Sequence, residues 1–236
     1  FKSLKTNPLQ LKPEDPQFRP GFRMLPDFLS RHPEPAIIKN IYETAEAFRD
    51  GTGPDFEIRM DLNFSQRTEG FIRIAKALEP LNLAWLECDI HDPDALRLLR
   101  DSTSTPIASL ETIHGLGSFK PFIERMACAV AIVDVQWNGM WESVRIASLC
   151  DAFEIDCAPH NFAGHLSSYI SAHFCASIPN YRIMEYDMDE APWRNDIFTH
   201  PPVIENGQFL LSRRPGWGTD INEEAVKAHP PKKNKR

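Results

Sequence analysis

The chain has 236 residues, with 26 Lys and Arg against 33 Asp and Glu, so its formal net charge is −7. This acidic balance argues against a nucleic-acid binder that depends on neutralising phosphates, because such a protein needs a basic face. No run approaches the roughly 18 continuous apolar residues of a membrane-spanning helix, so we expect no membrane partner.

The predicted elements begin with a short strand over 1–6 and a proline-rich excursion over 8–35. Short apolar runs, typical of buried strands, then follow at 56–60, 83–86, 107–110, 129–133, 153–157 and 181–184. Amphipathic segments of helical length alternate with them at 36–48, 68–78, 94–100, 119–125, 140–150 and 164–175. Repeated strand–helix units of this kind predict an α/β fold with a parallel sheet.

We favour a barrel over an open sheet, because no glycine-rich phosphate-binding turn follows an early strand. A complete eight-stranded barrel takes about 250 residues, so seven predicted strands leave it one strand short. The expected division is a barrel domain over 1–222 and a basic C-terminal tail over 223–236.

The five cysteines lie singly in apolar segments, without a CxxC pair, at Cys88, Cys128, Cys150, Cys157 and Cys175. This pattern predicts buried free thiols. Free thiols are typical of a reducing compartment, so we expect a cytoplasmic protein.

Each predicted strand presents an ionisable side chain at or just beyond its end: Lys5, Asp61, Glu87, Glu111, Asp134, His160 and Glu185. Catalytic groups of a parallel barrel gather at these strand ends. Asp61, Glu87 and Glu111 are 26 and 24 residues apart, about one strand–helix unit each. Three converging carboxylates repel one another, and the ion that suits such a set of oxygen ligands is Mg²⁺.

Six motifs in order resemble strand-end motifs of the enolase superfamily: Met60-Asp61-Leu62-Asn63, Trp85-Leu86-Glu87-Cys88-Asp89, Ser109-Leu110-Glu111, Val133-Asp134-Val135 with Gly139, Pro159-His160-Asn161, and Pro215-Gly216-Trp217-Gly218. The chain is most similar to the C-terminal barrel domain of the mandelate racemase and muconate lactonizing enzyme branch, which contains acid-sugar dehydratases. The resemblance extends from residue 1 to about residue 222. It implies a TIM-like modified (β/α)7β barrel.

The resemblance also implies roles for individual residues. Asp61, Glu87 and Glu111 match the ligands of a Mg²⁺ ion that binds the substrate carboxylate and stabilises an enolate. His160 matches the general base and Asp134 its partner, an arrangement in which a carboxylate fixes the tautomer of the imidazole.

Four further residues, Glu185, Lys5, Asn7 and Asn63, match less strictly defined positions. Glu185 matches an acid that hydrogen-bonds the developing enolate in some relatives. Lys5 and Asn7 align with a Lys-x-Lys motif whose later lysine is a base in the racemase, and Asn cannot abstract a proton. Asn63 faces the same cleft, where it could hydrogen-bond the substrate.

The motifs also depart from the family pattern. The second ligand is followed by Cys88-Asp89 where an acid and a proline are common, and Leu110 precedes the third ligand where glycine is common. The family's N-terminal capping domain and the first barrel strand are not in the sequence. We expect them elsewhere in the same full-length chain, and, as in relatives, a homo-oligomer.

These observations favour a Mg²⁺-dependent dehydratase of a sugar acid, an aldonate or aldarate, that gives a 2-keto-3-deoxy acid. Two alternatives stay open. One is a racemase or epimerase of 2-hydroxy acids, which Asn7 disfavours. The other is a non-catalytic metal-binding barrel, which the altered motifs after Glu87 and before Glu111 favour.

Overall fold

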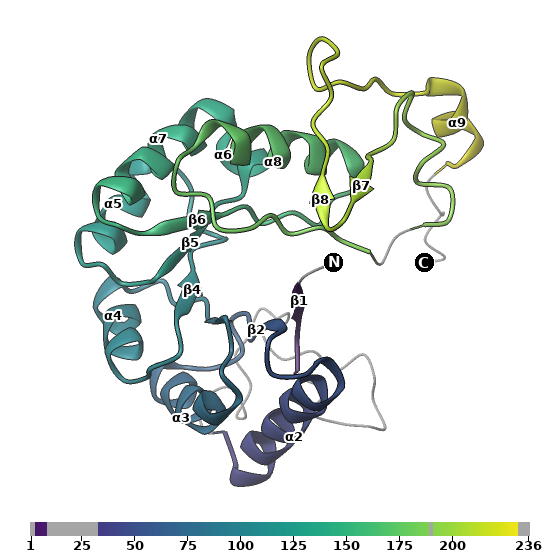
Figure 1. Cartoon of the computed structure of the whole chain (residues 1–236). Helices are drawn as coiled ribbons and strands as arrows, with labels where there is room; N and C mark the ends of the chain where they lie inside the picture. The colour runs from purple at the N-terminus through teal and green to yellow at the C-terminus, as the bar shows by residue number, and fades with distance from the viewer. Residues whose placement is uncertain (1–2, 9–32, 189–190, 231–236) are drawn as a thin grey trace, which may run out of the picture.

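The sheet at the centre of the molecule is parallel throughout and curled. The structure is a computed structural model that describes residues 3–8, 33–188 and 191–230. The six strands of the sheet follow one another in chain order. They are β1 (Ser3–Thr6), β2 (Glu57–Asp61), β3 (Trp85–Glu87), β4 (Ile107–Ser109), β5 (Val130–Ile132) and β6 (Asp156–Ala158). Figure 1 shows this sheet bending into an arc, so the fold is a half-barrel of the expected α/β class.

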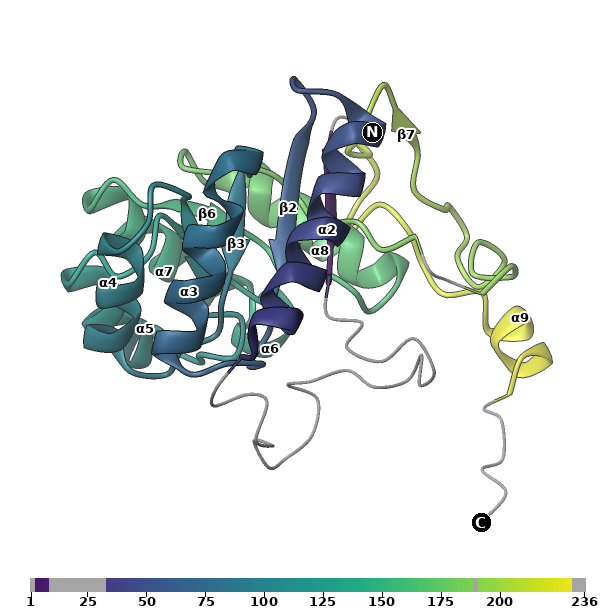
Figure 2. The ribbon, with the colours of Figure 1, turned by 90° about the horizontal axis from the view of Figure 1, so that it is seen from below.

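The helices that connect the strands lie along the outer side of the arc (Figure 1). They are α2 (Pro35–Thr52), α3 (Thr68–Leu78), η1 (Glu79–Leu81), α4 (Pro93–Asp101), α5 (Leu116–Glu124), α6 (Val135–Asn138), α7 (Met140–Ala152) and α8 (His165–Ser177). The view in Figure 2, from below, shows the same separation of inner strands and outer helices. Two of these helices begin with a proline, whose fixed φ suits the first helical position.

The side chains of each strand alternate between the helical layer and the concave face of the sheet. Ile58, Met60 and Leu86 are fully buried in the main apolar core against the helices. The concave face carries a smaller cluster of Trp85, Ala108, Val130, Ile132 and Ala158. Glu87 follows Trp85 by two residues and therefore points to the same concave face. The C-terminal end of this strand thus places a polar side chain next to the apolar cluster of that face.

Two of the predicted strands differ from the structure. The run 153–157 is a strand only from Asp156, because the turn that ends α7, with Glu154 at φ 56°, takes up its first residues. The run 181–184 pairs with β6 only through an isolated parallel bridge between Cys157 and Tyr181. Pro159 lacks the N–H that would continue this ladder, so the seventh strand is not formed as predicted.

The C-terminal part forms small elements that the periodicity did not predict. Strands β7 (Ile204–Glu205) and β8 (Gln208–Phe209) form a hairpin whose turn residues Asn206 and Gly207 have positive φ, as a type I′ turn requires. Residues of the expected tail form helix α9 (Glu223–Ala228). Most of the expected excursion over 8–35 lies outside the described residues, and Pro35 already belongs to α2.

The five cysteines are free and buried, which confirms that part of the sequence prediction. Among the helices in the described part of the chain, none has the length and apolar composition to cross a membrane.

Candidate functional site

Three carboxylates meet at the C-terminal ends of β2, β3 and β4. Asp61 is the last residue of β2 and Glu87 the last of β3, and the two are register partners in the sheet. Glu111 follows the end of β4 by two residues. One oxygen of each carboxylate lies within 4.8 Å of the other two, and all three residues are buried. The structure thus brings together the trio that the sequence predicted.

Leu110 sets the direction of Glu111. It has a φ of 92°, a backbone conformation that costs a residue with a Cβ on the order of 1–2 kcal/mol. Its side chain is nevertheless buried in the main core, only 1% exposed. This is the position where the family pattern has glycine, the residue that adopts a positive φ without a steric cost.

Placing three carboxylates together has an electrostatic cost. Burial raises the pKa of Glu87 well above its usual range, against the opposing charge of Lys5. Burial likewise raises the pKa of Glu111, against the opposing charge of His160. The Oε1 atom of Glu87 is buried and has no hydrogen-bond partner. Three converging carboxylates, one of which has an oxygen without a hydrogen-bond partner, form a set of oxygen ligands that suits a hard divalent cation such as Mg²⁺.

Lys5 is the cationic side chain at this end of β1. Its Nζ lies 3.1 Å from Glu87 Oε2 and 3.3 Å from Asp61 Oδ2, and a third carboxylate, Glu185 Oε1, is 2.9 Å away. Burial alone would lower the pKa of Lys5, but the three carboxylates outweigh it and raise the pKa well above its usual value. The Lys5 side chain is therefore a protonated ammonium group.

His160 and Asp134 form the predicted pair. The Nδ1 atom of His160 lies 2.8 Å from Asp134 Oδ2, and its Nε2 atom lies 3.6 Å from Glu111 Oε2. Asp134 is fully buried and is also the N-cap of α6, where Oδ1 accepts the N–H groups of Gln136 and Trp137. The helix cap thus fixes the carboxylate that orients the imidazole, with Nε2 turned toward the carboxylate trio.

Two exposed aromatic rings lie against the imidazole. The ring centroids of Trp137 and Phe162 are 5.2 Å and 4.9 Å from that of His160. Trp137 is 47% exposed and Phe162 56% exposed, which is high for large apolar side chains. Neither ring was predicted from the sequence, although each lies within three residues of a predicted site residue.

The two asparagines proposed to bind substrate lie beside the first ligand. The side-chain amide of Asn7 donates to Asn63 Oδ1, and the Asn63 backbone N–H donates to Asp61 Oδ1 over 2.8 Å. Asn63 is buried with a φ of 48°. All nine predicted site residues therefore lie at one end of the sheet.

Asn161 had no predicted role, although it belongs to the Pro159-His160-Asn161 motif. The structure shows it fully buried and bonded to Glu185, with its backbone N–H 2.8 Å from Oε2 and its side-chain amide 2.7 Å from the carbonyl oxygen. The signal available in the sequence was only its place next to the predicted base.

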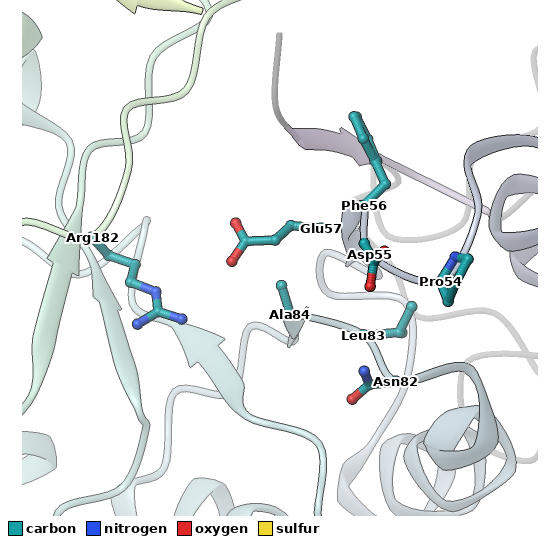
Figure 3. Close-up of a pocket in the computed structure, with 8 residues that line it drawn as sticks. All are labelled: Pro54, Asp55, Phe56, Glu57, Asn82, Leu83, Ala84 and Arg182. Atoms are coloured by element: carbon teal, nitrogen blue, oxygen red, sulfur yellow. The ribbon is translucent and has the colours of Figure 1, made fainter.

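Among the cavities formed by the described residues, two border the sheet. The larger, about 1410 Å³, lies along the concave face between β1, residues 181–188 and the β7–β8 hairpin, and reaches Lys5 and Glu185. The smaller, about 160 Å³, lies at the opposite, N-terminal ends of β2 and β3 (Figure 3). It is lined by Glu57 and Arg182 among others and contains none of the predicted site residues.

The curled parallel half-barrel with polar side chains at its C-terminal strand ends is the arrangement expected of an enolase-type barrel domain. The family model described as enolase C-terminal domain-like matches residues 29–225. The chain therefore belongs to this family.

Curated relatives include two sugar-acid dehydratases. D-xylonate dehydratase of Haloferax volcanii is 29% identical over 206 residues, which is 86% of this chain and 50% of that protein. D-mannonate dehydratase of a Sphingomonas species is 28% identical over 193 residues, 79% of this chain and 47% of that protein. The chain thus spans about half the length of the curated relatives it matches.

Solved structures include a Burkholderia xenovorans protein whose proposed activity is that of an L-alanine-DL-glutamate epimerase. It is 44% identical, with a TM-score of 0.92 over 98% of this chain and 59% of that one. A second structure, described in the same way and bound to magnesium and fumarate, is 47% identical with a TM-score of 0.83 over 85% of this chain and 50% of that one. A mandelate racemase/muconate lactonizing enzyme-like protein of Rubrobacter xylanophilus is 29% identical, with a TM-score of 0.86 over 98% of this chain and 58% of that one.

Proposed function

We propose that the whole protein is a Mg²⁺-dependent dehydratase of a sugar acid, an aldonate or aldarate. The reaction removes the proton next to the carboxylate and the hydroxyl group on the next carbon, and the enol that results tautomerises to a 2-keto-3-deoxy acid. The names of the curated relatives support the substrate class.

His160 is the proposed base. Its Nδ1–H donates to Asp134, which leaves the Nε2 lone pair to accept the α-proton on the side of the carboxylate trio. The C–H electrons move toward the substrate carboxylate, and the C–O bond of the β-hydroxyl then breaks. The hydroxyl leaves as water after it receives a proton, and the same imidazole can return that proton if the two groups leave from one face.

The charged state of Lys5 favours dehydration over racemisation. A racemase needs a base on each face of the α-carbon. Three carboxylates hold Lys5 as a charged ammonium, and the side chain two residues further along the chain is Asn7, which is no base. The proposed role of Lys5 is therefore to pair with negative charge on the substrate, with proton abstraction left to His160 alone.

Asp61, Glu87 and Glu111 are the residues that would hold the cation, with Glu87 Oε1 as an orphaned donor. A bound Mg²⁺ supplies positive charge for the substrate carboxylate and for the charge that develops on it. Asn63 and Asn7 are the proposed hydrogen-bond partners of the substrate beside this cation.

Epimerisation is the second candidate function. The 44–47% identity with structures described as L-alanine-DL-glutamate epimerases favours it, since this exceeds the identity with the curated dehydratases. The two activities differ in the product, because an epimerase returns the proton to the opposite face and keeps the β-hydroxyl.

The capping segment that closes the site is proposed to come from the rest of the full-length chain, and the assembly to be a homo-oligomer. We also propose a cytoplasmic location, which the five free thiols support.

The test uses the full-length protein with Mg²⁺ and a panel of sugar acids, assayed for 2-keto acid by semicarbazide absorbance. A parallel incubation in D₂O, followed by NMR, detects exchange of the α-proton and inversion of the α-carbon. We expect a 2-keto acid product from at least one sugar acid, and none from the His160→Asn variant.

Inversion without a 2-keto acid would replace dehydration with epimerisation. Neither product nor deuterium uptake with any acid of the panel would reject dehydration and epimerisation of these acids, and would favour a non-catalytic barrel or a substrate class outside the panel.

A further inference from the structure

Asn161 joins the strand of the base to Glu185. It is 1% exposed and follows His160 directly. Its backbone N–H donates to Glu185 Oε2 over 2.8 Å, and its side-chain Nδ2 donates to the Glu185 carbonyl oxygen over 2.7 Å. One residue therefore fixes both the main chain and the carboxylate of Glu185.

The orientation of the Asn161 amide is set from the other side. Ser167 donates its hydroxyl to Asn161 Oδ1, and Nδ2 also donates to Ser168 Oγ over 3.1 Å. Both serines are buried on α8, 1–2% exposed. A flipped amide would turn its oxygen toward the Glu185 carbonyl, so the helix holds Nδ2 in the donating position.

Pro159 explains why this link is needed. Beside Cys157, the ladder to the next segment is intact, because its N–H donates to the Asn180 carbonyl and its carbonyl accepts from Arg182. In a parallel ladder every second residue bonds to the neighbouring segment, so Pro159 is the next residue that would do so, and it has no N–H to donate. Asn161 and Glu185 lie at the same offset of 24 residues as the Cys157–Tyr181 bridge, so Asn161 resumes the pairing with its side chain.

The position of Glu185 matters because its other oxygen, Oε1, lies 2.9 Å from Lys5 Nζ. Lys5 in turn contacts the carboxylates of Asp61 and Glu87. We propose that Asn161 is a positioning residue, which acts through Glu185 to set where that carboxylate and the Lys5 ammonium meet the substrate. This inference rests on the proposed function and assigns a role that no sequence motif indicated.

The kinetic test is a double-mutant cycle in the full-length enzyme with Asn161→Ala, Glu185→Gln and the pair. The alanine variant keeps the backbone N–H and removes the bonds of the side chain. Because displacement of a reacting group by about 1 Å costs up to about 100-fold, we expect Asn161→Ala to lower kcat about 10- to 100-fold with little change in KM. If Asn161 acts through Glu185, the double variant is no slower than Glu185→Gln alone.

Asn180→Ala is the matched control. Asn180 lies at the opposite end of the contact between β6 and residues 180–185, where its Nδ2 donates to the carbonyl oxygens of Ala147 and Ile155. We expect this variant to lose thermal stability to a similar degree and to keep its kcat. Multiplying effects in the double variant, or an equal loss of kcat in Asn180→Ala, would overturn the positioning role.

A crystal structure of the Asn161→Ala variant gives a readout that does not depend on turnover. The expected result is a Glu185 carboxylate displaced from Lys5, and an unmoved carboxylate would overturn the inference. Because this readout needs no substrate, it tells a failure of the positioning role from a failure of the proposed dehydratase activity.

Discussion

Leu110 combines two demands that conflict at a single residue. Its φ of 92° is a glycine conformation, while its side chain fills part of the main core. A buried leucine changed to alanine loses about 2–5 kcal/mol, whereas release of the backbone strain returns about 1–2 kcal/mol when the new residue is glycine. At Leu110, the usual order in which an alanine variant is more stable than a glycine variant should therefore not hold.

We expect Leu110→Gly to be no less stable than Leu110→Ala in urea denaturation. At Leu99, fully buried inside α4, the same pair of substitutions serves as the control, and glycine should be worse than alanine by about 1 kcal/mol. The same ranking at both positions would contradict a strained Leu110.

Asp134 serves both the helix and the base, and the two roles are separable. Asparagine caps helices as well as aspartate does, so Asp134→Asn keeps the start of α6, whereas Asp134→Ala loses it at a cost of about 1 kcal/mol. Burial lowers the pKa of His160, but the hydrogen bond to Asp134 and the charge of Glu111 outweigh it and raise the pKa above its usual value.

Because the base must be neutral, kcat/KM should rise with pH as His160 loses its proton, above the ordinary histidine range. Without the Asp134 charge the pKa falls, so the acid limb of the profile for Asp134→Asn should move to lower pH. The plateau should drop about 100-fold or more, since the tautomer is no longer fixed. An acid limb that stays in place would mean that another group controls it.

At the scale of the element, the short helix α6 carries Trp137 into contact with the base. A half-exposed indole beside the proposed base offers a flat surface for the C–H face of a sugar-acid carbon chain. We expect Trp137→Ala to raise KM about 10-fold with a smaller effect on kcat, and Trp137→Phe to restore most of the loss. Trp141, 76% exposed on α7, gives the matched control Trp141→Ala, whose KM should not change.

The periodicity of the sequence was sufficient for most elements of the barrel. The alternation of apolar runs placed the helices α3 and α7, and the strands β2 to β5, within a few residues of their positions. The strand-end residues followed, because a parallel sheet has all its C-terminal ends at one edge.

What the sequence could not show depended on contacts between distant segments. The break at Pro159 separates residues 181–184 from a ladder that their own composition favours. The bond from Asn161 to Glu185 and the approach of Phe162 to His160 depend on the packing of the loops between strands, for which no periodic pattern exists.

At the scale of the whole molecule, the carboxylate trio ties β2, β3 and β4 together through a site with unfavourable electrostatics. A ligand that binds only the folded state stabilises it, by about 2.7 kcal/mol at a hundredfold excess over Kd. We expect Mg²⁺ to raise the thermal unfolding temperature of the full-length protein and EDTA to reverse this. The Glu111→Gln variant should show a much smaller increase, and an equal increase would place the ion elsewhere.

The five buried thiols can report on local opening of the sheet and its helices. Burial raises the pKa of the Cys175 thiol on α8 to about 12 and also raises that of Cys128, and the pKa of Cys150 is raised by its hydrogen bond with Cys157 and by burial. An alkylating reagent reacts with thiolate, so each of these cysteines is protected as long as its segment stays closed. The order in which iodoacetamide labels Cys88, Cys128, Cys150, Cys157 and Cys175, read by mass spectrometry, would therefore rank the local opening rates along the half-barrel without any introduced probe.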